Sequence, residues 1–317
     1  MQNFKSVLTK DEIAVFTLRA LYNEYGYSHY KMSKFEEYDL YVRNKDFLVS
    51  DNVITFTDTD GRLLALKPDV TLSIIKNTKD FNGLTKLCYD EKVYRVSKGT
   101  KTFKEITQVG LECLGDVDLS TIAEVLFLAG KSLDLISNEN VLEVSHLDVV
   151  KGLLTALGVS DYGKKEIFKY LGQKNSQAVF SVCVSEGLTE DKTALVNKLV
   201  NLYGNIDTVL GELDAFIVDD STSKAVSELK TVLTDLKNRG LSDKVCVDFS
   251  VVNDMNYYNG FAFKGFIEGI PTGILSGGQY DNLMVKMQKN SKAIGFAVYL
   301  DELGKLSGLG SNYEKDA

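Results

Sequence analysis

The sequence has few of the residues that bind metals or carry out redox chemistry. It contains four cysteines, two histidines, two prolines and no tryptophan in 317 residues. The two histidines, His29 and His146, are far apart, so a multi-histidine metal site is not expected. No Cys-x-x-Cys pair is present, which excludes the common zinc and dithiol motifs and predicts reduced, mostly buried thiols. The cysteines are Cys88, Cys113, Cys183 and Cys246. The sequence therefore predicts no metal ion and no cofactor.

An excess of basic charge and long apolar runs are also missing. The 36 basic and 44 acidic residues give a formal net charge of −8. A broad basic face for nucleic acids is therefore not expected, and tRNA is not an expected partner. No apolar run approaches the ~18 residues of a membrane span, and the first residues lead directly into a charged amphipathic helix. These features predict a globular, cytoplasmic protein.

Hydrophobic periodicity predicts an α+β fold. Thr9 and Glu12 form a capping box before a helix that ends at Gly26, and Thr121 and Glu124 form a second box for a helix over 121–137. Shorter helices are predicted over 68–78 and 280–288. Strand-like segments occupy 53–56, 63–66, 86–96, 103–114, 141–146, 244–252, 260–266, 273–275 and 293–299. The pattern is that of an antiparallel sheet flanked by helices.

One long segment differs in character from the rest. Residues 149–242 contain successive amphipathic helices with almost no strand-like alternation. We interpret this segment as a helical insertion in a core that is formed by residues 1–148 and 243–304. Residues 305–317 are expected to form a frayed C-terminal tail.

The strand predicted over 103–114 carries a polar face. Residues two apart share a face of a strand, so Gln108, Gly110 and Glu112 lie together on one side. An amide and a carboxylate on either side of a bare glycine could hold a small polar ligand against the sheet. The alternative is a solvent-facing strand with a glycine at a bulge, and spacing alone favours this alternative.

Other polar residues are candidates with equally ordinary structural explanations. Asp69 follows Pro68 and could point a carboxylate across the same sheet, or it could simply begin a helix. Arg95 could bind a carboxylate or phosphate, or form a surface ion pair. Tyr257 and Tyr258 could stack on a ring, although adjacent aromatic residues in a strand commonly divide between core and surface. Judged separately, the structural explanations are favoured.

Taken in order, these segments resemble the catalytic core of the class II histidyl-tRNA synthetases and of their non-catalytic relative, the regulatory subunit of ATP phosphoribosyltransferase. Residues 66–71 (Leu-Lys-Pro-Asp-Val-Thr) resemble the Arg-Pro-Glu-x-Thr turn of that family, and 93–95 with 107–112 resemble motif 2. Residues 254–259 resemble its histidine-specific segment, and 277–281 with 295–303 resemble the stretch that leads into motif 3. The resemblance spans residues 9–303, and several ordered motifs make coincidence an unsatisfactory explanation.

The resemblance implies a histidine-binding site. In that family, the acidic residue of the proline turn and the glutamine and glutamate of motif 2 hold the amino group of histidine, and the tyrosine pair meets the imidazole. The threonine of the turn lines the same pocket. Of the arginines that the family uses, this chain keeps only the one in motif 2. The residues that inherit these positions are Asp69, Thr71, Arg95, Gln108, Glu112, Tyr257 and Tyr258.

The chain departs from the synthetases where ATP would be activated. Asn253 replaces the arginine that opens the histidine-specific segment, and Glu302 replaces the arginine that grips ATP in motif 3. The loss of one preorganised charge-stabilising donor typically costs about 10²–10³ in rate. Only Gly304–Ala317 follow the last motif, so we expect no anticodon-binding domain.

The resemblance with these departures predicts a non-catalytic regulatory subunit of ATP phosphoribosyltransferase, which catalyses the first step of histidine biosynthesis. The implied partner is the short-form catalytic subunit, the implied effector is histidine, and self-association through class II-like dimer contacts would involve the N-terminal helix and the strand after it. One alternative is an amino-acid-activating enzyme of the class II type with an acceptor other than tRNA. Another is a binding module that senses uncharged tRNA.

Overall fold

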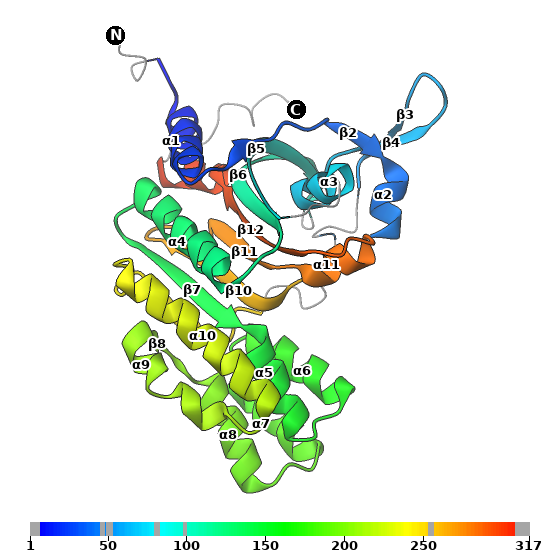
Figure 1. Cartoon of the computed structure of the whole chain (residues 1–317). Coiled ribbons are helices and arrows are strands. Elements are labelled where there is room, and N and C mark those ends of the chain that lie inside the picture. Colours follow the sequence, from blue (N-terminus) through cyan, green and yellow to red (C-terminus); the bar gives the residue numbers. More distant parts are fainter. Residues whose placement is uncertain are drawn as a thin grey trace.

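The computed structural model describes residues 7–44, 48, 53–78, 83–97, 100–252 and 257–307, the last four of these by backbone alone. A large twisted sheet forms the centre of the upper half in Figure 1, and a group of helices hangs below one end of it. Within the described residues this sheet has nine strands in the order β1-β5-β6-β12-β11-β10-β7-β9-β8. Its pairs are antiparallel except for β1 with β5 and β7 with β9, which are parallel. The predicted α+β class with an antiparallel sheet is confirmed.

The strands of the large sheet are β1 (Ser28–His29), β5 (Leu84–Val96), β6 (Phe103–Gly115), β7 (Asn140–His146), β8 (Tyr203–Asn205), β9 (Val245–Asp248), β10 (Asn259–Ile267), β11 (Leu275–Gln279) and β12 (Lys292–Tyr299). A small sheet consists of β2 (Phe35–Glu37), β4 (Leu63–Leu66) and β3 (Thr55–Thr57). The hairpin expected between residues 53–56 and 63–66 is thus present, with β3 and β4 antiparallel.

Helices cover both faces of the sheet. Those around it are α1 (Lys10–Glu24), α2 (Tyr38–Arg43), α3 (Val70–Asn77), α4 (Leu119–Ile136), α11 (Asp281–Lys286) and the 3₁₀ helix η4 (Leu300–Ser307). The lower group is α5 (Leu147–Ala156), α6 (Asp161–Gly172), α7 (Ser176–Ser185), α8 (Glu190–Val200), α9 (Ile206–Leu210), η3 (Leu213–Phe216) and α10 (Asp220–Asn238). No helix among the described residues is both long enough and apolar enough to cross a membrane.

The N-terminal capping box forms as predicted, but the second one does not. The backbone N–H of Glu12 donates to Oγ1 of Thr9, and the Glu12 carboxylate accepts from the Thr9 N–H in return. Helix α4 instead begins at Leu119, because Asp118 accepts the backbone N–H of Thr121 at 2.8 Å. A carboxylate three residues before a free N–H is a strong cap, and its negative charge favours the helix N-terminus.

Several strands also differ from the sequence prediction, including β9, which ends at Asp248 and not at residue 252. Strand β11 runs over Leu275–Gln279, later than the predicted 273–275, so Gly277 and Gly278 lie within the sheet. They are needed there: a Cβ on Gly277 would lie 2.5 Å from the carbonyl oxygen of Gly295. In the segment predicted to be wholly helical, β8 pairs with β9 and adds an edge strand to the sheet.

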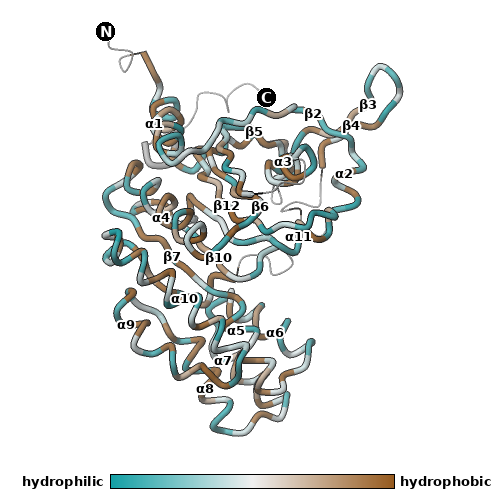
Figure 2. The backbone as a smooth tube through the Cα atoms, in the orientation of Figure 1, coloured by the Kyte–Doolittle hydropathy of each residue, from teal (hydrophilic) through white to brown (hydrophobic). Residues whose placement is uncertain are grey.

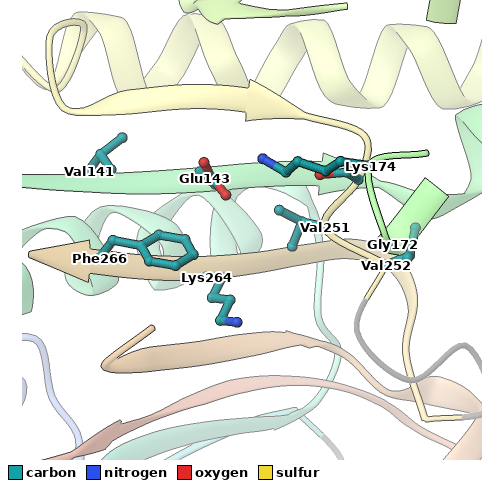
Figure 3. A pocket seen from close by; sticks show the side chains of 9 residues that line it. Val141, Glu143, Gly172, Lys174, Val251, Val252, Lys264 and Phe266 are labelled. Carbon is teal, nitrogen blue, oxygen red and sulfur yellow. The ribbon is translucent and has the colours of Figure 1, made fainter. Parts of the chain in front are cut away.

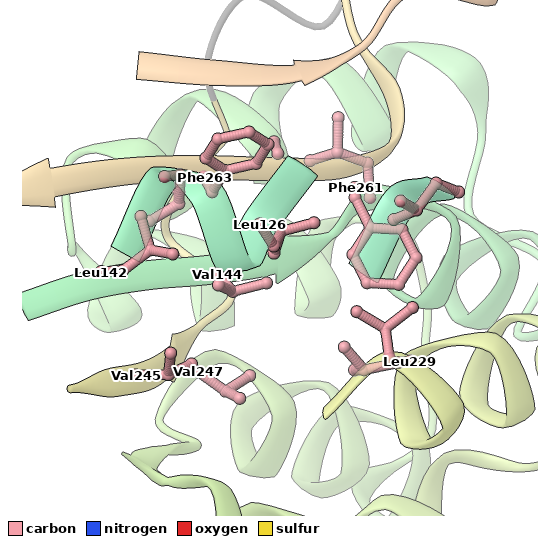
Figure 4. Close-up of a cluster of buried hydrophobic side chains, with 14 of the residues drawn as sticks. Leu126, Leu142, Val144, Leu229, Val245, Val247, Phe261 and Phe263 are labelled. Carbon is pink, nitrogen blue, oxygen red and sulfur yellow. The ribbon is translucent and has the colours of Figure 1, made fainter. Parts of the chain in front are cut away.

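A continuous apolar core joins the sheet to the lower helices. Figure 4 shows Leu126 of α4, Val144 of β7 and Phe261 of β10 beside Leu229 of α10, and all four are buried. Figure 2 shows apolar residues concentrated along the central strands and α4, whereas the tip of the β3–β4 hairpin is hydrophilic. The core covers the sheet face that packs against α1 and α4. The opposite face, under α3 and α11, is left for polar groups and a second apolar cluster.

Candidate functional site

Strand β6 presents the predicted polar face toward the interior of the protein. Gln108 and Glu112 are 3% and 2% exposed. Val109 and Leu111 point to the opposite face and join the core beneath α1 and α4. A fully buried carboxylate costs free energy unless other groups satisfy it. This burial is not what a solvent-facing strand would show.

Two hydroxyl groups hold the carboxylate of Glu112 between α3 and the end of β11. Oγ1 of Thr71 donates to Oε1 at 2.7 Å, and the hydroxyl of Tyr280 donates to Oε2 at 2.5 Å. Burial nevertheless raises the pKa of the Glu112 carboxyl to about 8, and the neighbouring Asp69 adds to the increase, while the two hydrogen bonds oppose it. A cationic group next to Glu112 would favour the carboxylate form.

Glycines on the neighbouring strands make room for these side chains. Gly295 of β12 lies opposite Glu112, and Gly278 of β11 lies opposite Gly295. A Cβ on Gly295 would lie 1.8 Å from Oε2 of Glu112, and one on Gly278 would lie 2.5 Å from Cδ1 of Tyr258. The two glycines therefore form a trough across the sheet in which the carboxylate and the tyrosine ring lie.

Gly110 has a different role from the one predicted. The sequence suggested that this glycine would let a ligand approach the sheet. In the structure Tyr89 of β5 is its cross-strand partner, and a Cβ on Gly110 would lie 2.5 Å from the Tyr89 hydroxyl oxygen. The Tyr89 side chain therefore fills the space beside Gly110, because a large residue opposite a glycine can lie across it.

The proline turn places Asp69 and Arg95 next to each other. Asp69 caps α3, with Oδ1 accepting the backbone N–H of Leu72 at 2.9 Å, so it does begin a helix. Burial raises the pKa of Asp69, and Arg95 opposes the increase. Nε of Arg95 donates to the carbonyl oxygen of Pro68 at 2.9 Å. Arg95 thus holds the turn and supplies positive charge beside Asp69, instead of forming a surface ion pair.

The two tyrosines before β10 lie together at the same site. The rings of Tyr257 and Tyr258 are 4.8 Å apart at 63°, and that of Tyr280 lies 6.0 Å from Tyr257. Burial raises the pKa of both hydroxyls, and Thr71 hydrogen-bonds to Tyr257. Tyr257 is buried and Tyr258 is partly buried, so the pair does not divide between core and surface. Asn253, where a family arginine is absent, lies outside the described residues.

Gln108 lies on the same face but farther along β6. Four residues separate it from Glu112, which corresponds to about 13 Å along a strand. It lies opposite Glu91 of β5 and Tyr299 of β12. Five of the other predicted site residues therefore lie around Glu112 or at the adjoining proline turn, and Gln108 extends the same polar face toward η4.

Carboxylates gather where β12 leads into η4. Oδ2 of Asp301 accepts the backbone N–H of Thr107 at 2.7 Å, and Oε2 of Glu302 accepts from Oγ1 of Thr272 at 2.6 Å. Burial raises the pKa of Asp301. This end of the polar face therefore carries acidic groups, which oppose the approach of a polyphosphate.

Sequence reasoning did not identify the residues that shape the carboxylate's surroundings. Tyr280, Gly295 and Gly278 lie in segments whose resemblance to the family was noted, but they were not placed in the site. The sequence feature that could have identified Gly278 and Tyr280 is the Gly-Gly-Gln-Tyr run over 277–280, in which two glycines closely precede an aromatic hydroxyl. Only the strand register shows that these positions lie opposite Glu112.

The chain is similar to known proteins over most of its length. The family model described as Histidyl-tRNA synthetase matches residues 8–303. The ATP phosphoribosyltransferase regulatory subunit of Oceanobacillus iheyensis is 29% identical over 283 residues, covering 88% of this chain and 69% of that protein. The protein of the same name from Clostridium kluyveri is 29% identical, covering 91% of this chain and 75% of its own length.

Solved structures show the same fold. A crystal structure of an ATP phosphoribosyltransferase regulatory subunit/histidyl-tRNA synthetase from Bacillus halodurans has a TM-score of 0.82 at 25% identity, covering 92% of this chain and 77% of that one. A chain of the ATP phosphoribosyl transferase (HisG:HisZ) complex from Thermotoga maritima has a TM-score of 0.70 at 17% identity, covering 95% and 98%. With a family model that matches most of its length, the chain belongs to the histidyl-tRNA synthetase family.

Proposed function

We propose that this chain is a regulatory subunit of ATP phosphoribosyltransferase, without catalytic activity of its own, that binds and activates the short catalytic subunit in the first step of histidine biosynthesis. The observation that carries the proposal is similarity over most of the chain to proteins named as regulatory subunits of that enzyme. The fold is also that of a chain in a solved complex of the transferase.

The charges of the polar face support a subunit that does not activate ATP. Glu302 occupies the position of the ATP-gripping arginine of the resembling family, and Asp301 lies beside it. Two unit charges 4 Å apart interact by roughly 4 kcal/mol at an effective dielectric constant of about 20. A change from attraction to repulsion at this position therefore disfavours a bound triphosphate strongly.

The group around Glu112 supports histidine as the effector. A histidine ligand carries an ammonium group, and Glu112 and Asp69 are two buried carboxyls whose pKa values are raised by burial. A bound ammonium group would compensate both carboxylates. The rings of Tyr257, Tyr258 and Tyr280 supply surfaces that a planar imidazole can contact.

Self-association is a further part of the proposal. Among the described residues, β1 lies at the edge of the large sheet and pairs with β5 alone. Helix α1 precedes it and leaves Phe16 half exposed. An open strand edge beside an exposed aromatic side chain favours pairing with a second copy of the chain.

We also propose that residues 149–242 form a helical insertion in a core made of residues 1–148 and 243–304, followed by a tail over 305–317. The support is the position of the flanking strands. The chain leaves the sheet after β7 and returns through the short edge strand β8 to β9, which is the parallel neighbour of β7, with Leu142 opposite Val245. A segment whose two ends lie side by side can be inserted without disturbing the sheet.

Assembly and amino-acid activation test the proposal directly. The full chain, mixed with the short catalytic subunit of the same organism, is expected to elute with it in size-exclusion chromatography and to increase its formation of phosphoribosyl-ATP. We expect no histidine-dependent ATP–pyrophosphate exchange by the chain alone. Separate elution together with amino-acid-dependent exchange would overturn the proposal in favour of an amino-acid-activating enzyme.

A further inference from the structure

A cavity lies on the same face of the sheet as Glu112, near the lower helices. Its volume is about 420 Å³, and residues of β7, β10, the end of α6 and the segment after β9 line it. Figure 3 shows Glu143, Lys174 and Lys264 at this cavity, with Val141 and Phe266 along its strands. The volume lies within the usual range for small-molecule sites.

The cavity contains two opposite charges that are neighbours on the sheet but do not pair. Glu143 of β7 lies directly opposite Lys264 of β10. Such a pair would ordinarily attract across the strands. Within the described part of the chain, however, neither residue takes part in an ion pair, although pairs involving many other charged residues are present.

The reason is the path of the Lys264 side chain. It runs over Gly273, where a Cβ would lie 2.3 Å from Cε of Lys264, and its ammonium group lies 5.3 Å from the centroid of the Phe266 ring. Figure 3 shows it leaning away from Glu143. The glycine thus allows the sheet to hold a cation and an anion apart.

Lys174 adds a second cation on the other side of Glu143. It follows α6 in a left-handed backbone conformation, with φ of 54°, and its ammonium group pairs with Asp248 at 2.7 Å. Burial raises the pKa of Glu143, the neighbouring Asp248 carboxylate adds to the increase, and the two lysines oppose it. The carboxylate therefore lies in a partly apolar setting where a ligand cation would be favourable.

We propose that this cavity is a binding site for a small zwitterion of amino-acid size, whose amino group pairs with Glu143 and whose carboxylate pairs with Lys264. A simple anion would meet the carboxylate of Glu143, and a simple cation would meet the two lysines. A zwitterion satisfies both signs at once. Val141 and Phe266 provide an apolar wall for the remainder of such a molecule.

This site is separate from the one around Glu112. The register places Glu112, Gly295, Gly278, Ala262 and Ser145 in one line across five strands. Four steps between strands correspond to about 19 Å. Glu143 lies two residues from Ser145 on the same face. The inference therefore does not depend on the proposed histidine site, and variants can test the two separately.

Calorimetric titration of the full chain with each of the twenty proteinogenic L-amino acids tests the proposal. We expect at least one of them to bind with an affinity that Glu143→Gln and Lys264→Met each lower by about tenfold or more, the loss of one paired charge. Glu112→Gln is expected to leave this binding unchanged. Lys224→Met, a lysine outside this cavity, serves as the matched control. Methylamine and acetate, which carry only one of the two charges, are expected to bind far more weakly.

The proposal is overturned if every binding event that is detected is lost in Glu112→Gln, or if no amino acid binds. It is also overturned if Lys264→Met leaves the affinity within about twofold of that of the unmodified chain. Thermal unfolding of each variant shows whether it is folded. Should Glu143→Gln fail to fold, the Lys264→Met variant decides the matter, because the lysine ammonium group takes part in no ion pair among the described residues, and methionine keeps an apolar side chain over Gly273.

Discussion

The hydroxyl of Tyr280 donates a hydrogen bond to Oε2 of Glu112 at 2.5 Å, although 168 residues separate the two in the sequence. Strand register brings them together: Glu112 of β6 lies opposite Gly295 of β12, which pairs with β11, and Tyr280 follows β11 directly. Together with the hydrogen bond from Thr71, this contact positions the carboxylate on which the proposed effector site depends, and it opposes the increase that burial causes in the pKa of Glu112.

The first prediction concerns this hydrogen bond. Tyr280→Phe removes the donor that lowers the pKa of Glu112, so the carboxylate form becomes less favourable and histidine affinity is expected to fall about tenfold, the value of one charge-assisted hydrogen bond. Calorimetric titration with histidine measures the change. Tyr162→Phe, at an exposed position on α6, is the matched control and should bind as the unmodified chain does. Equal affinity in the two variants would remove Tyr280 from the site.

The second prediction concerns the pH dependence of stability. Because burial raises the pKa of Glu112 from 4.5 to about 8, the folded state retains a proton that the unfolded state releases. The associated stability is fully present below pH 4.5 and is lost as the pH rises toward about 8. Glu112→Gln removes this dependence, so the difference in unfolding free energy between the two chains should change across that window. Parallel curves from denaturant titrations at several pH values would contradict the assignment.

The third prediction concerns the glycine trough. Gly295→Ala places a Cβ 1.8 Å from Oε2 of Glu112, so the carboxylate must move or the strands must separate. We expect a loss of about 1–3 kcal/mol in unfolding free energy, typical of overpacking, together with a loss of histidine binding. Gly211→Ala is the control, because its Cβ would meet no atom closer than 3.6 Å. Histidine binding that survives Gly295→Ala would show that the carboxylate does not contact the ligand.

The sequence allowed part of this site to be predicted, because a period of two along one strand places Gln108 and Glu112 on the same face. The residues that surround Glu112 could not be predicted from this period. Gly277 and Gly278 lie outside the strand predicted over 273–275, since glycine weakens an isolated strand, and only the neighbouring strands show why the side chains must be absent. The prediction that Gly110 leaves room for a ligand is wrong for the same reason. The residue that fills the space beside a glycine is set by the strand register, and here it is Tyr89.

The start of α4 also differs from the start that the capping-box pattern predicted. Thr121 and Glu124 matched the pattern of a capping box, but Asp118 accepts the Thr121 N–H and starts the helix earlier. Glu124 then pairs with Lys86 of β5 at 2.7 Å, so a tertiary contact uses the side chain that the pattern assigned to the cap. The alternation of helices and strands was predicted more reliably than the groups that terminate them.

The fourth prediction concerns the core shared by the sheet and the lower helices. Leu229 of α10 is fully buried beside Phe261 of β10 (Figure 4), so Leu229→Ala should lower the unfolding free energy by about 2–5 kcal/mol. Because the core is continuous, the sheet and the helices should still unfold in one transition, as followed by far-ultraviolet circular dichroism and tyrosine fluorescence. Leu135→Ala, at a half-exposed position, should have a small effect. Two separate transitions would show that the helical segment folds independently.

The proposed regulatory function is tested most directly by the rate at which the short catalytic subunit forms phosphoribosyl-ATP. This rate is measured with and without this chain across a titration of histidine. We expect the chain to stimulate the reaction and histidine to reverse the stimulation, whereas Glu112→Ala should abolish the histidine response and leave stimulation and co-elution intact. The absence of any change in rate on addition of the chain would contradict the regulatory function. Stimulation that histidine does not reverse would contradict the proposed effector site.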